Sequence, residues 1–252
     1  MSRYKTPETR QASRDKKNRE KFPELVAGQS ELEAHLEYEM NKVRFCQFQP
    51  RNKAQERYAD AIEEKRIIFA LGPAGVGKTF VATSIACEML EAKEIERIII
   101  ARPMVGCDEE IGALPGSEME KYAPWLGPFF DVMEGKLGKK KVESYLQYGK
   151  IVARPLMMMR GTTFRNALVI LDEAQNTTPG QMKMFLTRLG EGSRVIIDGD
   201  LEQSDLPAGK LNGLADATHK LRNSNSAAFV EFTEDDITRD PLVREIVLAY
   251  RN

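Results

Sequence analysis

The stretch RIIFALGPAGVGKTF, from Arg66 to Phe80, places three glycines within six residues, directly before Lys78 and Thr79. This is the spacing of a phosphate-binding loop, G-x-x-x-x-G-K-[ST], whose backbone N–H groups point inward at a phosphate. In this pattern Lys78 reaches the β- and γ-phosphates, and the Thr79 hydroxyl is a magnesium ligand. The residues expected to hold the nucleotide are Gly72, Pro73, Ala74, Gly75, Val76, Gly77, Lys78, Thr79 and Phe80.

The segments on both sides of this loop constrain the fold. Residues 67–71 form an apolar run that predicts a buried strand, and residues 79–92 are typical of a helix. The alternative interpretation is an accidental match within a flexible turn. A chance match would not be expected to have a strand directly before the loop and a helix directly after it. A strand, a glycine-rich loop and a helix in this order indicate an α/β protein that binds a nucleoside triphosphate.

Composition excludes several classes of protein. The 252 residues are 42% hydrophobic and carry a net charge of −1, so a surface that binds nucleic acid must be local. We find no apolar run that could span a bilayer and no signal-peptide core, so we expect a cytoplasmic protein without membrane contact. Cys46, Cys87 and Cys107 are scattered, and His35 and His219 are the only histidines, which argues against a disulfide framework or a structural zinc site.

The chain divides by composition into three parts. Residues 1–21 contain eight basic and three acidic residues and few large apolar ones, which predicts a disordered basic tail. Such a tail either contacts phosphates or only aids solubility. Residues 22–48 carry apolar side chains at helical spacing, which predicts an amphipathic helical extension packed on the core or on a neighbour. Residues 49–252 are expected to form the ATPase domain.

In this last part, short apolar runs alternate with helical segments. Strands are expected at residues 67–71, 97–101, 151–153, 167–171, 194–198 and 227–232. Helices are expected at residues 52–62, 79–92, 180–188, 211–221 and 241–250, with a helical and loop-rich stretch at 106–150. The alternation predicts a single domain with a mostly parallel sheet and helices on both faces.

A second group of candidate catalytic residues follows the strand in ALVILDEAQN, residues 167–176. Asp172 is expected to hold magnesium through its water shell. Glu173 is expected to point elsewhere and to orient or deprotonate an attacking water. An acidic turn without function is the alternative, but together with the phosphate loop the pair forms a phosphoryl-transfer site. A glutamate at this position favours hydrolysis.

A third polar cluster follows the strand in IIDGDLEQSDLP. It contains Asp200 and Gln203, which we expect at the same carboxyl edge of the sheet, where α/β proteins bind ligands. Gln203 can hydrogen-bond the γ-phosphate or the attacking water. The alternative is an ordinary turn rich in Gly and Asp.

Taken together, GPAGVGKT, RPMV, LPG, LDEAQNTTPGQMKMFLTRLG, GDLEQSDLP and DITRDPLVREIV resemble the PhoH family of P-loop ATPases, from about residue 51 to 250. The resemblance implies a single RecA-like domain, similar to the motor core of superfamily 1 helicases, that couples Mg²⁺-dependent ATP hydrolysis to single-stranded RNA or DNA. It also implies that Gln55 reads adenine, as a Gln amide can. The alternative is that Gln55 is a solvated helix position.

The resemblance also implies partners and cationic residues. Two-core helicases bind ATP between their cores, whereas this chain has length for one, so we expect a homo-oligomer, with a hexameric ring as one form, and an arginine supplied in trans. Arg239 is the first candidate, Arg102 and Arg244 are the others, and an intrachain salt bridge is the alternative for Arg239. The sequence reads Arg160-Gly161-Thr162-Thr163 where the family commonly has R-G-R-T.

Nucleic-acid contacts are expected to be local. The candidates are Arg102, Arg160 and a loop formed by Lys139, Lys140 and Lys141, for which a solvated loop is the alternative. Three functions remain open from the residues. A nucleic-acid-coupled ATPase fits best, a nucleotide-gated assembly or interaction protein with little turnover comes second, and a small-molecule kinase comes third because no acceptor site is recognisable.

Overall fold

The computed structural model describes residues 47–104, 123–207, 209–238 and 242. The chain divides into two units, Met1–Arg44 and Phe45–Asn252, and the described residues all belong to the second. The predicted basic tail at residues 1–21 and most of the predicted extension at 22–48 therefore lie outside the described residues. So do Arg239, Arg244 and, apart from Leu242, the helix expected at residues 241–250.

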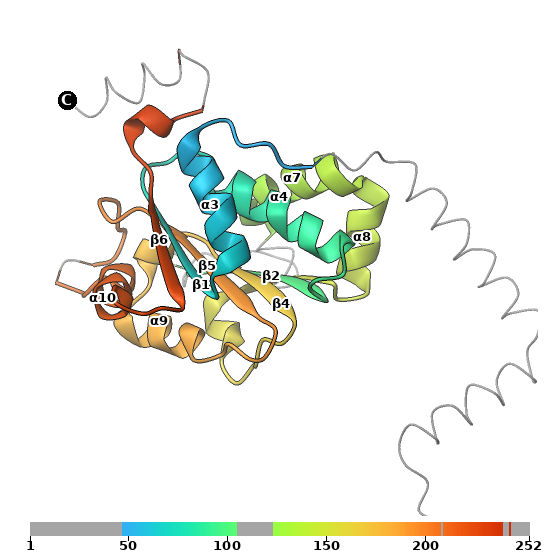
Figure 1. Cartoon of the computed structure of the whole chain (residues 1–252). Coiled ribbons are helices and arrows are strands. Elements are labelled where there is room, and N and C mark those ends of the chain that lie inside the picture. The colour runs from blue at the N-terminus through green and yellow to red at the C-terminus, as the bar shows by residue number, and fades with distance from the viewer. Residues whose placement is uncertain (1–46, 105–122, 208, 239–241, 243–252) are drawn as a thin grey trace, which may run out of the picture. The chain divides into compact units, whose positions relative to one another are not determined.

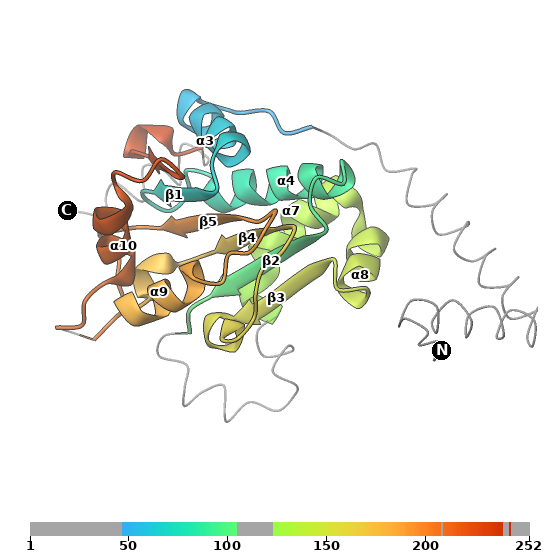
Figure 2. The same cartoon turned by 60° about the horizontal axis from the view of Figure 1, so that its bottom comes forward.

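The domain is built on a six-stranded sheet in the order β3-β2-β4-β5-β1-β6 (Figure 1 and Figure 2). The strands are β1 (Ile67–Leu71), β2 (Arg97–Arg102), β3 (Ile151–Pro155), β4 (Ala167–Leu171), β5 (Arg194–Gly199) and β6 (Ala227–Glu231). Every neighbouring pair is parallel, so the predicted α/β fold with a parallel sheet is confirmed. All five residues of β4 are buried, as expected for a strand that is covered on both faces.

Helices cover both faces of this sheet (Figure 2). One face packs against α3 (Lys53–Glu64), α4 (Lys78–Glu91), α7 (Gly127–Leu137) and α8 (Lys139–Gln147). The other face packs against α9 (Pro179–Leu186) and α10 (Gly213–Leu221). The short 3₁₀ segments are η1 (Ala123–Leu126), η2 (Leu156–Met159), η3 (Ala174–Asn176) and η4 (Glu234–Asp236). None of the helices in the described part of the chain has the length and apolarity needed to cross a membrane.

The sheet order determines which loops meet. Strand β5 lies between β1 and β4, and β2 lies on the far side of β4. Because all six strands are parallel, the segments that follow β1, β2, β4 and β5 emerge at one edge of the sheet. These are the segments that carry the predicted phosphate loop, Arg102, the acidic pair and the Asp200–Gln203 cluster.

The prediction that residues 139–141 form a loop is wrong, because these lysines lie in a helix. Gly138 ends α7 with a φ of +83°, and the three lysines form the first turn of α8. Lys141 is buried and forms an ion pair with Glu91 at the last residue of α4. The 14-residue helix α4 rises about 20 Å between the phosphate loop and Glu91, so this turn lies far from the phosphate loop.

A buried polar pair lies beneath the phosphate loop. Tyr58 of α3 donates a hydrogen bond of 2.7 Å to Oδ1 of Asp198 in β5, and neither residue is accessible to solvent. Oδ2 of Asp198 has no hydrogen-bond partner among the described residues. The pKa of Asp198 rises from 3.8 to about 7, mainly because the group is buried and in part because the carboxylate of Asp172 is nearby.

This raised pKa predicts a stability that falls as the pH increases. Between about pH 4 and pH 7 the folded protein holds a proton on Asp198 that the unfolded chain has released, so the free energy of unfolding decreases by on the order of 1 kcal/mol per pH unit. The variant Asp198→Asn should lose this part of the slope and keep the smaller part that Asp172 contributes. Urea unfolding at pH 5, 6, 7 and 8 measures it. Parallel curves for the two proteins would contradict the prediction, and the exposed Asp60→Asn serves as a control.

Candidate active site

The phosphate loop joins β1 to α4 and contains the backbone conformations that its glycines permit. Gly77 has a φ of +93° and caps α4, and a Cβ atom here would lie 2.7 Å from Nε2 of Gln55. Gly72 has a φ of +146°, and a Cβ atom would lie 2.4 Å from the carbonyl oxygen of Phe232. Substitution of either glycine would therefore cause both backbone strain and a clash.

Lys78 curls back over this loop. Its Nζ donates to the carbonyl oxygens of Gly72, at 2.7 Å, and Pro73, at 2.9 Å. The ammonium group is thus held at the mouth of the loop by two backbone acceptors, which a phosphate oxygen can replace.

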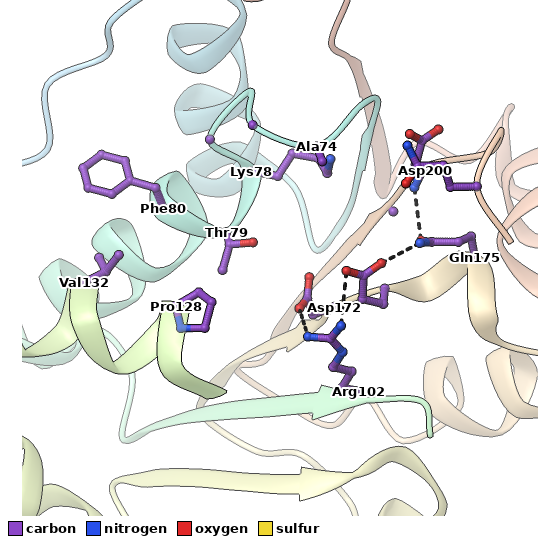
Figure 3. A pocket seen from close by; sticks show the side chains of 15 residues that line it. Ala74, Lys78, Thr79, Phe80, Arg102, Pro128, Val132, Asp172, Gln175 and Asp200 are labelled. Atoms are coloured by element: carbon purple, nitrogen blue, oxygen red, sulfur yellow. Dashed lines mark hydrogen bonds and ion pairs between the residues drawn. The ribbon is translucent and has the colours of Figure 1, made fainter. Parts of the chain in front are cut away.

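The acidic pair follows β4, and its two carboxylates converge on one guanidinium (Figure 3). Nη1 of Arg102 lies 3.5 Å from Oδ2 of Asp172, and Nη2 lies 3.3 Å from Oε1 of Glu173. Glu173 has a left-handed φ of +52°, which turns the chain out of the strand. The expectation that Glu173 points away from Asp172 is therefore wrong, because both carboxylates contact the same side chain.

Burial and charge set the protonation of Asp172. Burial raises its pKa from 3.8 to about 6, and the neighbouring Arg102 limits this increase. Another cation beside Asp172 would favour the ionised form still more.

Gln175, which is not among the predicted site residues, links the acidic pair to the loop after β5. Its side chain is buried, its Nε2 donates to Oε2 of Glu173, and its Oε1 accepts from the backbone N–H of Asp200 at 3.1 Å (Figure 3). Gln175 thereby fixes the carboxylate of Glu173 relative to β5. The only signal in the sequence was the position of an amide two residues after the acidic pair.

Gln55 is buried, so the alternative of a solvated helix position is wrong. Its Nε2 donates to the carbonyl oxygen of Val76 at 3.0 Å, and its Oε1 accepts from the backbone N–H of Arg51 at 3.0 Å. The Nε2 end of the amide thus connects α3 to the phosphate loop, and the Oε1 end binds the backbone just before α3. To bind adenine, Gln55 would have to exchange these two bonds.

One pocket of about 420 Å³ is lined by part of the phosphate loop, Arg102, the acidic pair and Gln175, whereas Gln55 and Gly72 are not in its lining. It is lined by Ala74, Gly75, Gly77, Lys78, Thr79, Phe80, Arg102, Pro128, Val132, Asp172, Glu173, Gln175, Gly199, Asp200 and Gln203. The structure therefore places Lys78, Thr79, Asp172, Glu173 and Gln203 around the same space. The Asp172 carboxylate and the Thr79 hydroxyl supply the oxygen ligands that Mg²⁺ prefers, so the residues present fit this ion.

The nucleic-acid candidates occupy three different places. Arg102 lies in the pocket wall, and Lys139 and Lys140 are exposed on α8, away from the pocket. Arg160 is exposed just after η2, which follows β3 at the carboxyl edge of the sheet. Of the described candidates, Arg160 is therefore the one that is exposed at the edge where the pocket opens.

Sequence comparison agrees with these features. The family model described as PhoH-like protein matches residues 47–251. The chain belongs to the PhoH-like family. It is 46% identical over 206 residues to Protein PhoH of Escherichia coli K12, a match that covers 79% of this chain and 57% of that protein. It is 45% identical over 196 residues to a PhoH-like protein of Bacillus subtilis, a match that covers 78% of this chain and 61% of that protein.

These family members are longer than the region they share with this chain, since the chain spans less than two thirds of each. Among solved structures, the large terminase of a thermophilic bacteriophage is similar with a TM-score of 0.48 and 14% identity, covering 79% of this chain and 50% of that one. The UvsW helicase of bacteriophage T4 is similar with a TM-score of 0.44 and 14% identity, covering 79% of this chain and 66% of that one.

Proposed function

We propose that this chain binds ATP with Mg²⁺ and hydrolyses it, and that single-stranded RNA or DNA stimulates the hydrolysis. The observation that carries the proposal is the single pocket in which the phosphate loop faces the Asp172–Glu173 pair. A phosphate loop alone would suit a nucleotide-gated binding protein equally well. Hydrolysis also requires a carboxylate next to the phosphate loop that can accept a proton from the attacking water.

In this mechanism each side chain has a separate task. Lys78 exchanges its two carbonyl acceptors for oxygens of the β- and γ-phosphates. Thr79 and Asp172 hold Mg²⁺, which when bound neutralises charge on the phosphates. Glu173, held by Gln175, orients the attacking water and accepts its proton. Gln203 hydrogen-bonds the γ-phosphate or the water from the loop after β5.

The nucleic-acid part of the proposal is supported by the surface next to η2. Arg160 is exposed there, and the neighbouring Met157 and Met158 expose 60% and 38% of their surface. An exposed cation at this edge can bind a backbone phosphate of a nucleic-acid strand, with the methionines as apolar surface beside it. The family resemblance to helicase cores supports the same assignment. We extend the proposal to a homo-oligomer, such as a hexameric ring, that completes each site with an arginine of the next subunit, with Arg239 as the candidate.

The test is steady-state ATP hydrolysis with poly(U), poly(dT) and duplex DNA of equal length. We expect a severalfold increase of kcat with at least one single strand and little change with the duplex. The variant Arg160→Ala should lose the stimulation and keep the basal rate, whereas Arg97→Ala, which removes an exposed arginine at the opposite end of the sheet, should keep both. Tight ATP binding with no turnover under any condition would instead indicate a nucleotide-gated interaction protein.

A further inference from the structure

Arg102 is the last residue of β2 and contacts three groups in the wall of the pocket. Besides the carboxylates of Asp172 and Glu173, it approaches Trp125 of η1, with its Cζ atom 5.6 Å from the centre of the indole ring. Its Nη1 also lies 3.5 Å from the carbonyl oxygen of Trp125. The guanidinium is thus positioned between the acidic pair and the ring, and it faces the same space as Lys78.

The contacts to the carboxylates are weak enough to be exchanged. At 3.3 and 3.5 Å they are longer than charge-assisted hydrogen bonds, which are usually about 2.7–2.9 Å. The Arg102 side chain also keeps 26% of its surface exposed, and solvent weakens an ion pair that is partly exposed. A triphosphate offers the same guanidinium a bidentate contact at the shorter distances that are usual for charge-assisted hydrogen bonds. The balance therefore favours transfer of Arg102 to the phosphate.

We propose that Arg102 is a catalytic residue of its own chain, which leaves Asp172 when the triphosphate binds and contacts the γ-phosphate oxygens. This inference rests on the proposed ATP hydrolysis. In the pocket without nucleotide, Arg102 contacts both carboxylates and offsets part of their negative charge. In the pocket with nucleotide, it supplies positive charge at the γ-phosphate and leaves the Asp172 carboxylate available, with Thr79, for Mg²⁺.

The proposed reaction is the transfer of the γ-phosphate from ATP to water. The oxygen of a water molecule forms a bond to the γ-phosphorus, while the bond from this phosphorus to the β–γ bridging oxygen breaks and its electron pair stays on ADP. Glu173 takes the proton that the water releases. Negative charge is spread over the γ-phosphate oxygens in this transition state, and the Arg102 guanidinium stabilises it there.

Trp125 provides a direct probe of this movement, because it is the only tryptophan of the chain. The guanidinium lies over its ring in the pocket without nucleotide, so transfer of Arg102 to the phosphate changes the surroundings of the indole. Tryptophan emission should therefore change when a nucleotide carrying a γ-phosphate binds. ADP, which lacks this phosphate, should produce little of the change.

The experiment follows Trp125 emission during titration with Mg²⁺ and either ADP or the non-hydrolysable analogue AMP-PNP. For wild type and for Arg97→Ala, a control on the same strand, we expect a change with AMP-PNP and little with ADP. Arg102→Ala should bind fluorescently labelled ADP within about threefold of wild type but lose the AMP-PNP-dependent emission change. An unaltered emission change in Arg102→Ala would overturn the proposal.

Turnover and subunit mixing complete the test. Arg102→Ala should lower kcat about a thousandfold. Arg102→Lys, which keeps the charge and the fold but not the planar fork, should remain at least about tenfold slower than wild type. Because Arg102 acts within its own chain, mixing Arg102→Ala with Lys78→Ala subunits should restore no activity. Restored activity would place Arg102 in a neighbour's site and overturn the proposal.

Different results would refute the role of Arg102 and the proposed ATP hydrolysis. If wild type hydrolyses ATP and Arg102→Ala does so within about threefold, Arg102 is only a structural ion pair and the ATPase proposal stands. If wild type binds no labelled ADP, both proposals fail. Thermal unfolding of each variant identifies any loss that comes from misfolding.

Discussion

Replacement of Lys78 by alanine is expected to lower kcat for ATP hydrolysis at least a hundredfold and to weaken ATP binding, while the fold stays intact. Within the described part of the chain, the Nζ atom of Lys78 donates to two backbone carbonyl oxygens, those of Gly72 and Pro73, and water can replace it there when the side chain is removed. The loss therefore falls on the triphosphate, because the cation on the β- and γ-phosphates is missing in the transition state.

The measurement is phosphate release at saturating ATP, combined with titration of labelled ATP. Lys220→Ala is the matched control, since Lys220 forms only an exposed pair with Asp216 on α10. This variant should keep both wild-type turnover and wild-type affinity. Normal turnover in a folded Lys78→Ala protein would refute the ATPase assignment as a whole.

Much of the fold could be predicted because the strands are short, apolar and buried on both faces. The runs ALVIL and RVIID are typical of buried strands at the centre of a parallel sheet. The structure confirms both, as β4 and β5. The lysines after Gly138 were misinterpreted for a different reason. A run of three lysines has the appearance of a solvated loop, and the pattern that places Val142 and Tyr145 on the buried face of α8 begins only after the run.

The site could be predicted where its residues are close in the sequence. The spacing within residues 72–79 and the adjacency of Asp172 and Glu173 are local patterns. The position of Arg102 depends instead on β2 lying beside β4, with Ala101 opposite Leu171, and strand order cannot be inferred from the order of elements in the chain. The burial of Gln55 likewise depends on the packing of α3 against the phosphate loop, which nothing near Gln55 in the sequence indicates.

The two members of the acidic pair should fail in different ways when their charges are removed. Glu173→Gln is expected to bind ATP with Mg²⁺ within a fewfold of wild type and to hydrolyse it about a hundredfold to ten-thousandfold more slowly, because only the proton acceptor is lost. The amide is nearly isosteric, and its oxygen can still accept from Nε2 of Gln175.

Asp172→Asn should instead lose the Mg²⁺ dependence of ATP binding, because it removes the carboxylate that is proposed to hold the ion. It should also unfold at a higher urea concentration than wild type at pH 8, since burial opposes the ionised form of Asp172 and the asparagine carries no charge. Binding of labelled ATP with and without Mg²⁺, followed by rapid-quench measurement of a single turnover, separates the two variants.

Glu143→Gln, an exposed carboxylate on α8, controls for the change of net charge. Equal ATP binding and equal hydrolysis in Asp172→Asn, Glu173→Gln and this control would mean that the end of β4 is an acidic turn without function. If Glu173→Gln retains wild-type turnover while Asp172→Asn loses Mg²⁺-dependent binding, the metal assignment stands and another group must accept the proton. Among the described residues, the remaining carboxylate that lines the pocket is Asp200. Its Oδ2 is buried without a hydrogen-bond partner in the described structure, so Asp200→Asn in the Glu173→Gln background would then decide between the two carboxylates.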